Sequence, residues 1–463
     1  MTDSNRTFMD RQNDVVIEDI LLSTEGASEP LSIKGMVGSI SIFEDITKHF
    51  MEGSILISDG QNIIDKVPFT GREFITITYR TPIEQELRTI QMRLYGQASR
   101  VRPADSKIDT IKLKMISEAG YVDSLNQISE KFDGDNSEIV NDLINRFYPA
   151  KENTIDETDS TKFKYVFPFQ RPSQMIKQIA ENSVPKNSKS PFENTGYLFF
   201  ETLNNYVFSP INFLINKDPK GYFSDIDSLR LSATPVSQDS RYHFSDRSVA
   251  MPQKVIGGVA FDRMTQIKNG GFSNTNYFHD MTTKEWGKEN FSYSEDSNSY
   301  ADFEPKTISD QIELVPRKKI INDSDNANTL PSVVNLFPRH SKVQGDDYGF
   351  NSVDYEIRRF RNSNFLCIGD MEYKLEVSGS SQLSAGDTVY LKVVKNAPES
   401  ELKISDVDEE KTGVYLIKAL HHFFVVGDEE YTTYKTSMRI VKNYRVNEIP
   451  SVGNLQFEGV KNA

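Results

Sequence analysis

Three short motifs have the residue types of a penicillin-binding serine enzyme and stand in the order that such an enzyme uses. They are Ser183-Val184-Pro185-Lys186, Ser324-Asp325-Asn326 and Lys411-Thr412-Gly413. In that chemistry the first serine is the nucleophile, and it must stand at the start of a buried helix. Here Ser183 falls at the predicted end of a helix that Pro185 stops, and Ser324 falls in a low-complexity loop. We interpret the motifs as coincidence, because motifs this short often occur by chance.

The histidines and acidic residues show no spacing typical of a metal site. His421 and His422 are adjacent in a predicted strand, where neighbouring side chains point to opposite faces and cannot share one ion. The acidic runs 323–325 and 406–410 lack the glycine and glutamate of an EF-hand loop. With one cysteine, Cys367, which we interpret as a core residue, we predict no zinc site.

Phosphate-binding and nucleic-acid-binding patterns are also missing from the sequence. Neither glycine-rich phosphate motif occurs, and Gly257-Gly258 and Gly270-Gly271 are typical of turns. The basic runs 317–319 and 358–359 are short and are expected on solvated faces. We therefore predict no catalytic, cofactor-binding or metal-binding residues, no cofactor, and a structural or interaction protein rather than an enzyme.

Length, charge and cysteine content describe an acidic chain of several domains. The 463 residues correspond to about three domains of roughly 150 residues each. Asp plus Glu (67) exceeds Lys plus Arg (53), and the net charge of −14 disfavours broad nucleic-acid binding. The single cysteine excludes an intramolecular disulfide. We expect neither a signal peptide nor a membrane span, because the N-terminus is polar and apolar runs stay well below about 18 residues.

The first part of the chain has the alternation typical of strands. Turn residues separate the predicted strands, and the residues 44–49 are short and polar enough for one helical turn at most. Closely spaced strands of this kind are typical of a sandwich or barrel. The predicted strands are 15–22, 53–58, 74–79, 90–95 and 107–116.

The period changes to a helical one at about Val122. Leu125, Ile128 and Phe132 follow helical spacing. A second helix is predicted to run from a cap at Asn136-Ser137 to Phe147, and a third begins after Pro172 with Ser173 as its cap. Strands 197–202 and 206–208 then flank Asn204-Asn205, which indicates a hairpin. This part is predicted to be α+β.

β character returns from Val255 onwards. A hairpin is predicted around Asn269-Gly270-Gly271, between strands 264–267 and 277–281. Residues 291–348 are rich in Ser, Asp, Asn and Pro and are predicted to form a long polar insert with one strand at 312–315. A helix is expected at 352–366. The remaining predicted strands are 373–377, 388–394, 414–426 and 431–441, and residues 447–463 are predicted to form a tail.

The order of these segments resembles the baseplate hub protein of contractile-tailed bacteriophages, which is related to the hub part of type VI secretion spikes. The first stretch that carries the resemblance comprises 52–57, 59–63, 74–79, 93–96 and the strand through Ile116 into 123–125. The second comprises 355–358, 373–377, 383–389, 413–417 with His422 and Phe424, and 431–439. Together they cover about half of the chain. Residues 124–240 fit the α+β domain of that family in outline, and 291–348 have no counterpart there.

The resemblance implies a β-rich α+β fold with two tail-tube-type β-barrel domains and an intervening α+β domain. The first barrel would span 1–123, the α+β domain 124–240, and the second barrel 241–446, interrupted by the polar insert at 291–348. The C-terminal tail would span 447–463.

The resemblance also implies a function and a set of partners. The chain would be a homotrimer that joins the sixfold tail tube to the threefold central spike in the virion, after assembly in the host bacterial cytoplasm. Its partners would be the spike, tail tube and tape-measure proteins and other baseplate proteins, and DNA would pass through the lumen without specific binding. Two alternatives stay open: a tail-associated cell-wall hydrolase, and a host-receptor adhesin that uses the aromatic-rich residues 255–300.

Overall fold

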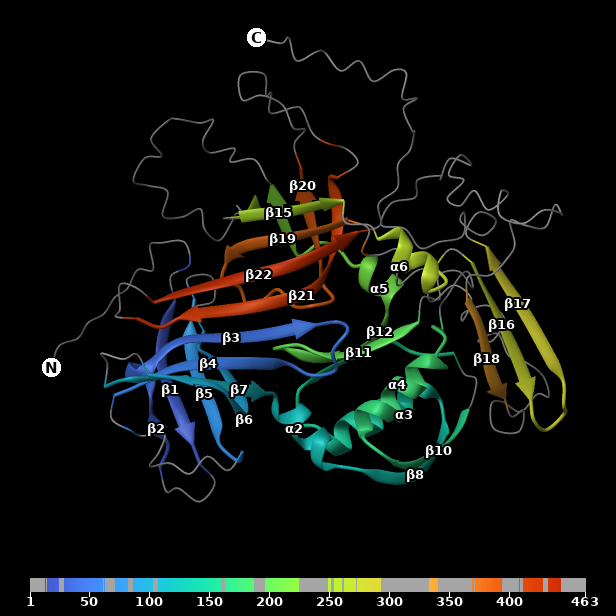
Figure 1. Ribbon diagram of the computed structural model, residues 1–463, viewed down its shortest axis with the longest axis horizontal. Coiled ribbons are helices and arrows are strands. Elements are labelled where there is room, and N and C mark those ends of the chain that lie inside the picture. The colour runs from blue at the N-terminus through green and yellow to red at the C-terminus, as the bar shows by residue number, and fades with distance from the viewer. Residues whose placement is uncertain are drawn as a thin grey trace, which may run out of the picture.

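The chain forms two β-units with a helical unit between them, and the long strands of both β-units lie in one sheet (Figure 1). The computed structural model describes residues 13, 15–24, 29–60, 62, 71–81, 86–102, 107–159, 163–186, 196–224, 249–250, 254–259, 262–271, 273–292, 333–339, 369, 371–393, 408, 411–427 and 432–442. The protein is β-rich with few helices, as the sequence predicts. The predicted strand at 312–315, the helix at 352–366 and the tail at 447–463 lie outside the described residues.

The first β-unit is an antiparallel sheet in the order β3-β4-β7-β6-β5-β1-β2. Its strands are β1 (Val16–Ser23), β2 (Leu31–Ser32), β3 (Val37–Asp45), β4 (Glu52–Asp59), β5 (Phe74–Arg80), β6 (Arg88–Val101) and β7 (Asp109–Ile116), with a short 3₁₀ turn, η1 (Lys34–Met36). Alternate residues are buried, such as Ile55 and Ile57 of β4. Strand β3 was missed by the sequence analysis, and residues 44 and 45, expected in a helical turn, end this strand.

In the described residues, the helical unit contains four helices and two small sheets. Its elements are α2 (Glu118–Leu125), β8 (Ile128–Gly134), α3 (Asn136–Phe147), β9 (Glu152–Ile155), β10 (Phe163–Gln170), α4 (Pro172–Glu181), β11 (Tyr197–Glu201), β12 (Asn205–Pro210) and the short α5 (Ile211–Ile215). Strand β10 pairs with β8, and β12 lies between β11 and β9. The predicted helices over α3 and α4 and the hairpin at Asn204-Asn205 are confirmed.

Three details predicted for this unit are wrong. The helical spacing of Leu125, Ile128 and Phe132 does not continue a helix, because α2 ends at Leu125 and β8 pairs its backbone with β10. Ser173 is not the cap of α4; Arg171 holds that position, while the hydroxyl of Ser173 donates to Asp123. Likewise α3 begins after Asp135 rather than at the predicted Asn136-Ser137 cap. In both helices tertiary hydrogen bonds engage the side chains that the local pattern assigned to capping.

The second β-unit has the order β14-β13-β20-β21-β22-β19-β15. Its strands are β13 (Gly221–Ser224), β14 (Val249–Ala250), β15 (Lys254–Val259), β19 (Met371–Ser378), β20 (Thr388–Lys392), β21 (Gly413–Val425) and β22 (Thr433–Lys442). The last four strands were all predicted. Buried residues such as Leu375, Ile417 and Met438 form its core.

A separate three-stranded sheet lies to one side of these units (Figure 1). It is formed by β16 (Ser273–Asp280), β17 (Trp286–Ser292) and β18 (Val333–Arg339), and it follows α6 (Arg263–Lys268). The hairpin expected around Asn269-Gly270-Gly271 is wrong, because α6 replaces its first strand. Asp262 starts this helix by accepting hydrogen bonds from the amide and hydroxyl of Thr265. The strand β18 lies inside the predicted insert, at a different place from 312–315.

The two β-units repeat one strand order. Six strands of the first unit correspond, in chain order, to six strands of the second. Strands that are hydrogen-bonded neighbours in one unit correspond to neighbours in the other. The corresponding strands are β1 and β13, β3 and β15, β4 and β19, β5 and β20, β6 and β21, and β7 and β22. The ladder β6–β7 shifts between Leu94 and Gly96, and the ladder β21–β22 shifts at the matching place, between Ile417 and Ala419. The two units differ in at least two respects. The ladder β6–β7 has a second shift, between Gln97 and Ser99, and β13 pairs parallel with β20, whereas β1 pairs antiparallel with β5.

Candidate functional site

The two β-units are joined edge to edge by β3 and β21, and we call this ladder the intrachain joint. It is antiparallel and runs from Ala419 opposite Asp45 to Val425 opposite Ser39. Before this point β21 pairs with β20, as far as Leu416. After its bulge it leaves β20 and takes β3 as its new neighbour. Figure 1 shows β22, β21, β3 and β4 as successive strands across the joint.

Aromatic side chains of the second β-unit complete the core of the first. Phe424 and Tyr434 are buried and belong to the apolar cluster of the first unit. Their rings stack with centroids 4.2 Å apart, and Tyr79 meets Phe424 edge to face at 5.1 Å. Stacked and edge-to-face aromatic pairs add to the stability gained from area burial. The joint is therefore held by packing as well as by backbone hydrogen bonds.

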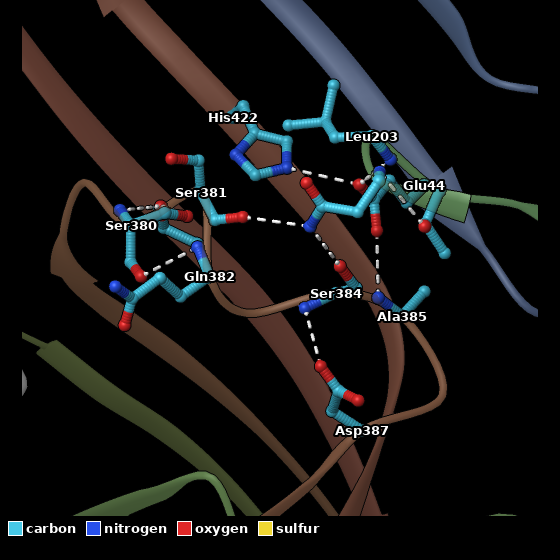
Figure 2. Close-up of polar contacts among 12 residues, drawn as sticks. Glu44, Leu203, Ser380, Ser381, Gln382, Ser384, Ala385, Asp387 and His422 are labelled. Carbon is cyan, nitrogen blue, oxygen red and sulfur yellow. Dashed lines mark hydrogen bonds and ion pairs between the residues drawn. The ribbon is translucent and has the colours of Figure 1, made fainter. Parts of the chain in front are cut away.

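A buried carboxylate, Glu44, links three parts of the chain at the joint (Figure 2). Its side chain lies at the end of β3 and its residue is 1% exposed. One oxygen accepts from the amide of Leu203, in the turn between β11 and β12, at 2.8 Å. The other accepts from the amide of Ala385, in the loop before β20, at 2.8 Å. A charged acceptor makes strong hydrogen bonds to backbone amides, so Glu44 fixes both loops against β3.

His422 adds a second link from β21. Its ring is fully buried, with Nε2 3.4 Å from Glu44 and Nδ1 2.6 Å from the hydroxyl of Tyr434. Both ring nitrogens thus face a polar partner, which a buried imidazole requires. The three side chains are closed to solvent. They can orient strands, but they offer no surface on which a substrate could be bound.

The loops on either side of Glu44 also bind each other. The side-chain amide of Asn204 donates to the carbonyl of Ser381 at 3.1 Å and to the hydroxyl of Ser384 at 3.2 Å. The carboxylate of Asp387 accepts from the amide of Ser384 at 3.0 Å and from Lys220 at 2.9 Å. Figure 2 shows the loop 380–387 folded back over His422 and Glu44. The helical unit is thereby tied to both β-units.

A second buried carboxylate, Glu201, ties the helical unit to the first β-unit. It accepts from the hydroxyl of Ser117 and from the amide of Met51, and it forms an ion pair with Lys151 at 2.8 Å. Nearby, Asp123 accepts from Tyr148 at 2.9 Å and from the amide and hydroxyl of Ser173. Burial and the charge of Asp123 hold the pKa of Tyr148 far above its ordinary value. Glu201 therefore links two units, whereas Asp123 fixes α2 against the end of α3 and the start of α4 within the helical unit.

His421 lies on the opposite face of β21 from His422, as the alternation predicts. Its ring stacks on Phe43 of β3, with centroids 4.3 Å apart. Burial, together with the neighbouring His422, lowers the pKa of His421 to about 4. In the described part of the chain, no group of three or more His, Cys, Asp or Glu side chains is placed to hold a metal ion.

The serine-enzyme motifs are not brought together by the described structure. The hydroxyl of Ser183 donates to the carbonyl of Ile179 at 2.8 Å and accepts from Asn136 at 3.1 Å. Lys186 pairs with Glu157, while Lys411 belongs to the second β-unit and pairs with Asp408. The motif 324–326 lies outside the described residues.

The buried role of Glu44 is not among the sequence predictions, although the sequence contains a signal for it. Ile40, Ile42 and Ile46 are buried, and Glu44 stands between them at the same two-residue spacing. A period of two places all four on one face of an extended chain. The inward position of Glu44 was not predicted because the polar residues that follow it resemble a turn.

The helices of the described part of the chain were also compared with what a membrane span requires. Each is too short or too polar to span a bilayer.

Comparison with known proteins finds similarity only among solved structures, since no family model and no curated protein matches. A tail protein from Neisseria meningitidis aligns with a TM-score of 0.49 and 8% identity, covering 93% of this chain and 97% of that one. The 43 kDa tail protein of prophage MuSo2 from Shewanella oneidensis aligns with a TM-score of 0.49 and 9% identity, covering 92% and 98%.

An E. coli component of the type VI secretion system, described as similar to T4 bacteriophage tail proteins, aligns with a TM-score of 0.38 and 8% identity, covering 92% and 79%. These three proteins are named as components of tails and of a secretion system. The chain is similar in structure to phage tail proteins, as its sequence resemblance predicts.

Proposed function

We propose that this chain is a structural subunit of the baseplate hub of a contractile phage tail. Three copies form a ring with six β-units, which joins a sixfold tail tube to a threefold central spike. The ring surrounds a channel through which DNA passes, and the subunit catalyses no reaction. The two β-units are tail-tube-type barrels in this proposal. The first lies within residues 1–123, the second is formed by residues 241–446 together with β13, and the α+β domain is the rest of 124–240.

The observation that carries the proposal is the intrachain joint between two units of the same strand order. A repeat joined edge to edge supplies two consecutive positions of a ring within one chain. Three chains therefore supply six such positions, which matches a sixfold neighbour on one side and a threefold neighbour on the other. The buried links through Glu44 and Phe424 keep the two positions at one fixed angle.

The mass and shape of the purified protein test this function. Light scattering is expected to give three times the 52.8 kDa of one chain, and negative-stain images are expected to show rings. Adding the tube, tape-measure or spike protein of the same phage is expected to yield complexes with opposite faces of the ring. A chain that stays monomeric at high concentration, with the spike present, would contradict the hub.

A second candidate, host-receptor binding, is favoured by one exposed face of the sheet β16–β18. Trp286 is 62% exposed and stacks on His279 at 4.3 Å, and Leu336 of β18 is also exposed on this sheet. Planar aromatic side chains are suited to contact with sugar rings. Because Trp286 is the single tryptophan of the chain, quenching of its fluorescence by host glycans would report binding directly. Unchanged fluorescence and equal cell binding by Trp286→Ala would exclude this role.

A further inference from the structure

The three-stranded sheet β16–β18 has two faces of different composition. On one of them, the inner face, Asn274, Asn276 and Phe278 of the central strand are buried. Amide side chains bind one another there, since Asn335 donates to Asn276 at 2.9 Å and Asn276 donates to Asn274 at 3.2 Å. Buried amides require such partners. The sheet therefore turns amides inward and presents other residue types on the opposite side, which we call the outer face.

The outer face exposes aromatic and aliphatic side chains in two rows. Opposed residues of paired strands share a face, so the register of the three strands defines these rows. The first row is Pro338, His279 and Trp286, and the second is Leu336, Tyr277 and Lys288. Trp286 is 62% exposed and Leu336 is 61% exposed. Exposed apolar side chains that are contiguous and edged by polar groups indicate a binding surface.

Trp286 forms a flat platform whose orientation is already fixed. Its ring stacks on His279, with centroids 4.3 Å apart and an angle of 22° between the ring planes. A side chain held in place before binding loses little conformational freedom when a ligand arrives. The exposed indole is therefore preorganised for an apolar surface of ring size, and the C–H face of a sugar ring is such a surface.

Lys288 gives the outer face a positive charge beside this platform. It follows Trp286 by two residues on the same face of β17, about 7 Å along the strand. Its ammonium lies 5.7 Å from the ring centre of Tyr277. Although 67 of the 463 residues of the chain are acidic, none of the residues in the two rows is. A cationic face on a protein of net charge −14 favours an anionic ligand.

We propose that the outer face binds an acidic saccharide, with a sugar ring stacked on Trp286 and an anionic group of the sugar bound by Lys288. The proposal rests on host-receptor binding, the second candidate function above, and names its ligand. The distance between the two residues fits a pyranose ring that carries a carboxylate or a phosphate. Hydrogen bonds from an ammonium to an anion are stronger than neutral ones, so Lys288 selects acidic sugars over neutral ones.

Titration of the fluorescence of Trp286 tests this site. Because Trp286 is the single tryptophan of the chain, a sugar ring stacked on it changes the intrinsic emission directly. The probes are oligogalacturonate and oligosialate, which carry carboxylates, and pentamannosyl phosphate. Their neutral counterparts are the methyl esters of the first two and mannopentaose. We expect a saturable change with at least one acidic probe, and at least about tenfold weaker binding of its neutral counterpart.

Substitution of two lysines locates the charge that selects the ligand. Lys288→Gln is expected to weaken binding of the acidic probe at least about tenfold and to reduce its sensitivity to salt. Lys284→Gln is the matched control, because Lys284 lies in the turn between β16 and β17, outside both rows. Trp286→Ala, followed by calorimetry, should abolish binding of the probe. This exposed position is expected to leave the mass by light scattering unchanged.

The possible failures have different meanings. Equal affinity for acidic and neutral sugars, or equal losses in Lys288→Gln and Lys284→Gln, would overturn the acidic ligand and leave receptor binding standing. Fluorescence that responds to no probe at millimolar sugar would overturn the site, and a response to another baseplate protein instead would identify the face as a protein contact. Light scattering tests the hub separately, so a trimer that binds no acidic sugar would overturn this site alone.

Discussion

At the scale of single residues, the main finding is that buried polar groups connect units rather than perform chemistry. Glu44, His422 and Tyr434 form a chain of polar contacts with the composition of a catalytic relay. Catalysis needs a reacting group within hydrogen-bond reach of its base. Here the polar atoms of these side chains bind other groups of the protein and are closed to solvent. The same residue types therefore stabilise the contact between units.

Removal of the Glu44 carboxylate is expected to destabilise the protein strongly. Glu44→Ala leaves the amides of Leu203 and Ala385 without their acceptor, and a buried unsatisfied group costs about 1–3 kcal/mol. The expected loss is about 3 kcal/mol of unfolding free energy, measured as a fall in Tm by calorimetry. Glu52→Ala is the control, because that carboxylate is half-exposed and pairs with Lys48 at the surface. Equal shifts for the two variants would contradict the role of Glu44.

His421 is expected to make stability depend on pH between about 6.5 and about 4. The pKa of His421 is lowered to about 4 by burial in the folded protein, while an unfolded histidine titrates near 6.5. Between these values the unfolded chain binds a proton that the folded chain does not, so lowering the pH favours unfolding. His421→Phe preserves a ring against Phe43 and should flatten Tm against pH in this window. An unchanged slope would contradict the assignment.

At the scale of elements, the joint between β3 and β21 makes two β-units into one structural body. The two units are separated by a whole helical unit in the sequence, yet their cores meet at Phe424 and Tyr434. Units that share a core are expected to unfold together. Calorimetry of the full chain should therefore show the two β-units in one transition.

Phe424→Ala tests this coupling. Truncation of a fully buried phenylalanine typically costs about 3–5 kcal/mol. Because Phe424 lies in the second β-unit but packs into the first, both units should lose hydrogen-exchange protection in the variant. Phe423→Ala, on the half-buried opposite face of the same strand, should have a smaller effect. Loss of protection confined to β19–β22 would show that the units are independent.

At the scale of the whole molecule, the net charge of −14 is consistent with the proposed channel, which would have to release DNA. An acidic surface repels the phosphate backbone and lacks the cations that drive counterion release. We expect no retardation of double-stranded DNA by the purified protein at physiological salt and micromolar concentration. Retardation that weakens as salt is raised would indicate a basic surface and argue against simple passage.

The sequence by itself determined the β-rich class, the long strands and the absence of a recognisable catalytic set. Strands such as β5 and β22 alternate apolar and polar residues, so local periodicity was sufficient to find them. The same principle placed His421 and His422 on opposite faces. Local periodicity gave the wrong element in two places. At β8 the pairing with β10 outweighed a helical spacing, and at α6 the cap at Asp262 outweighed a strand-like spacing.

Only the tertiary structure decided which strands meet. The ladder between β3 and β21 joins residues about 380 positions apart, and no local pattern encodes such a partner. The buried role of Glu44 depends on two loops and a histidine that come from three other parts of the chain. Periodicity reports which face of a strand is buried, whereas pairing depends on long-range packing that the whole fold must satisfy at once.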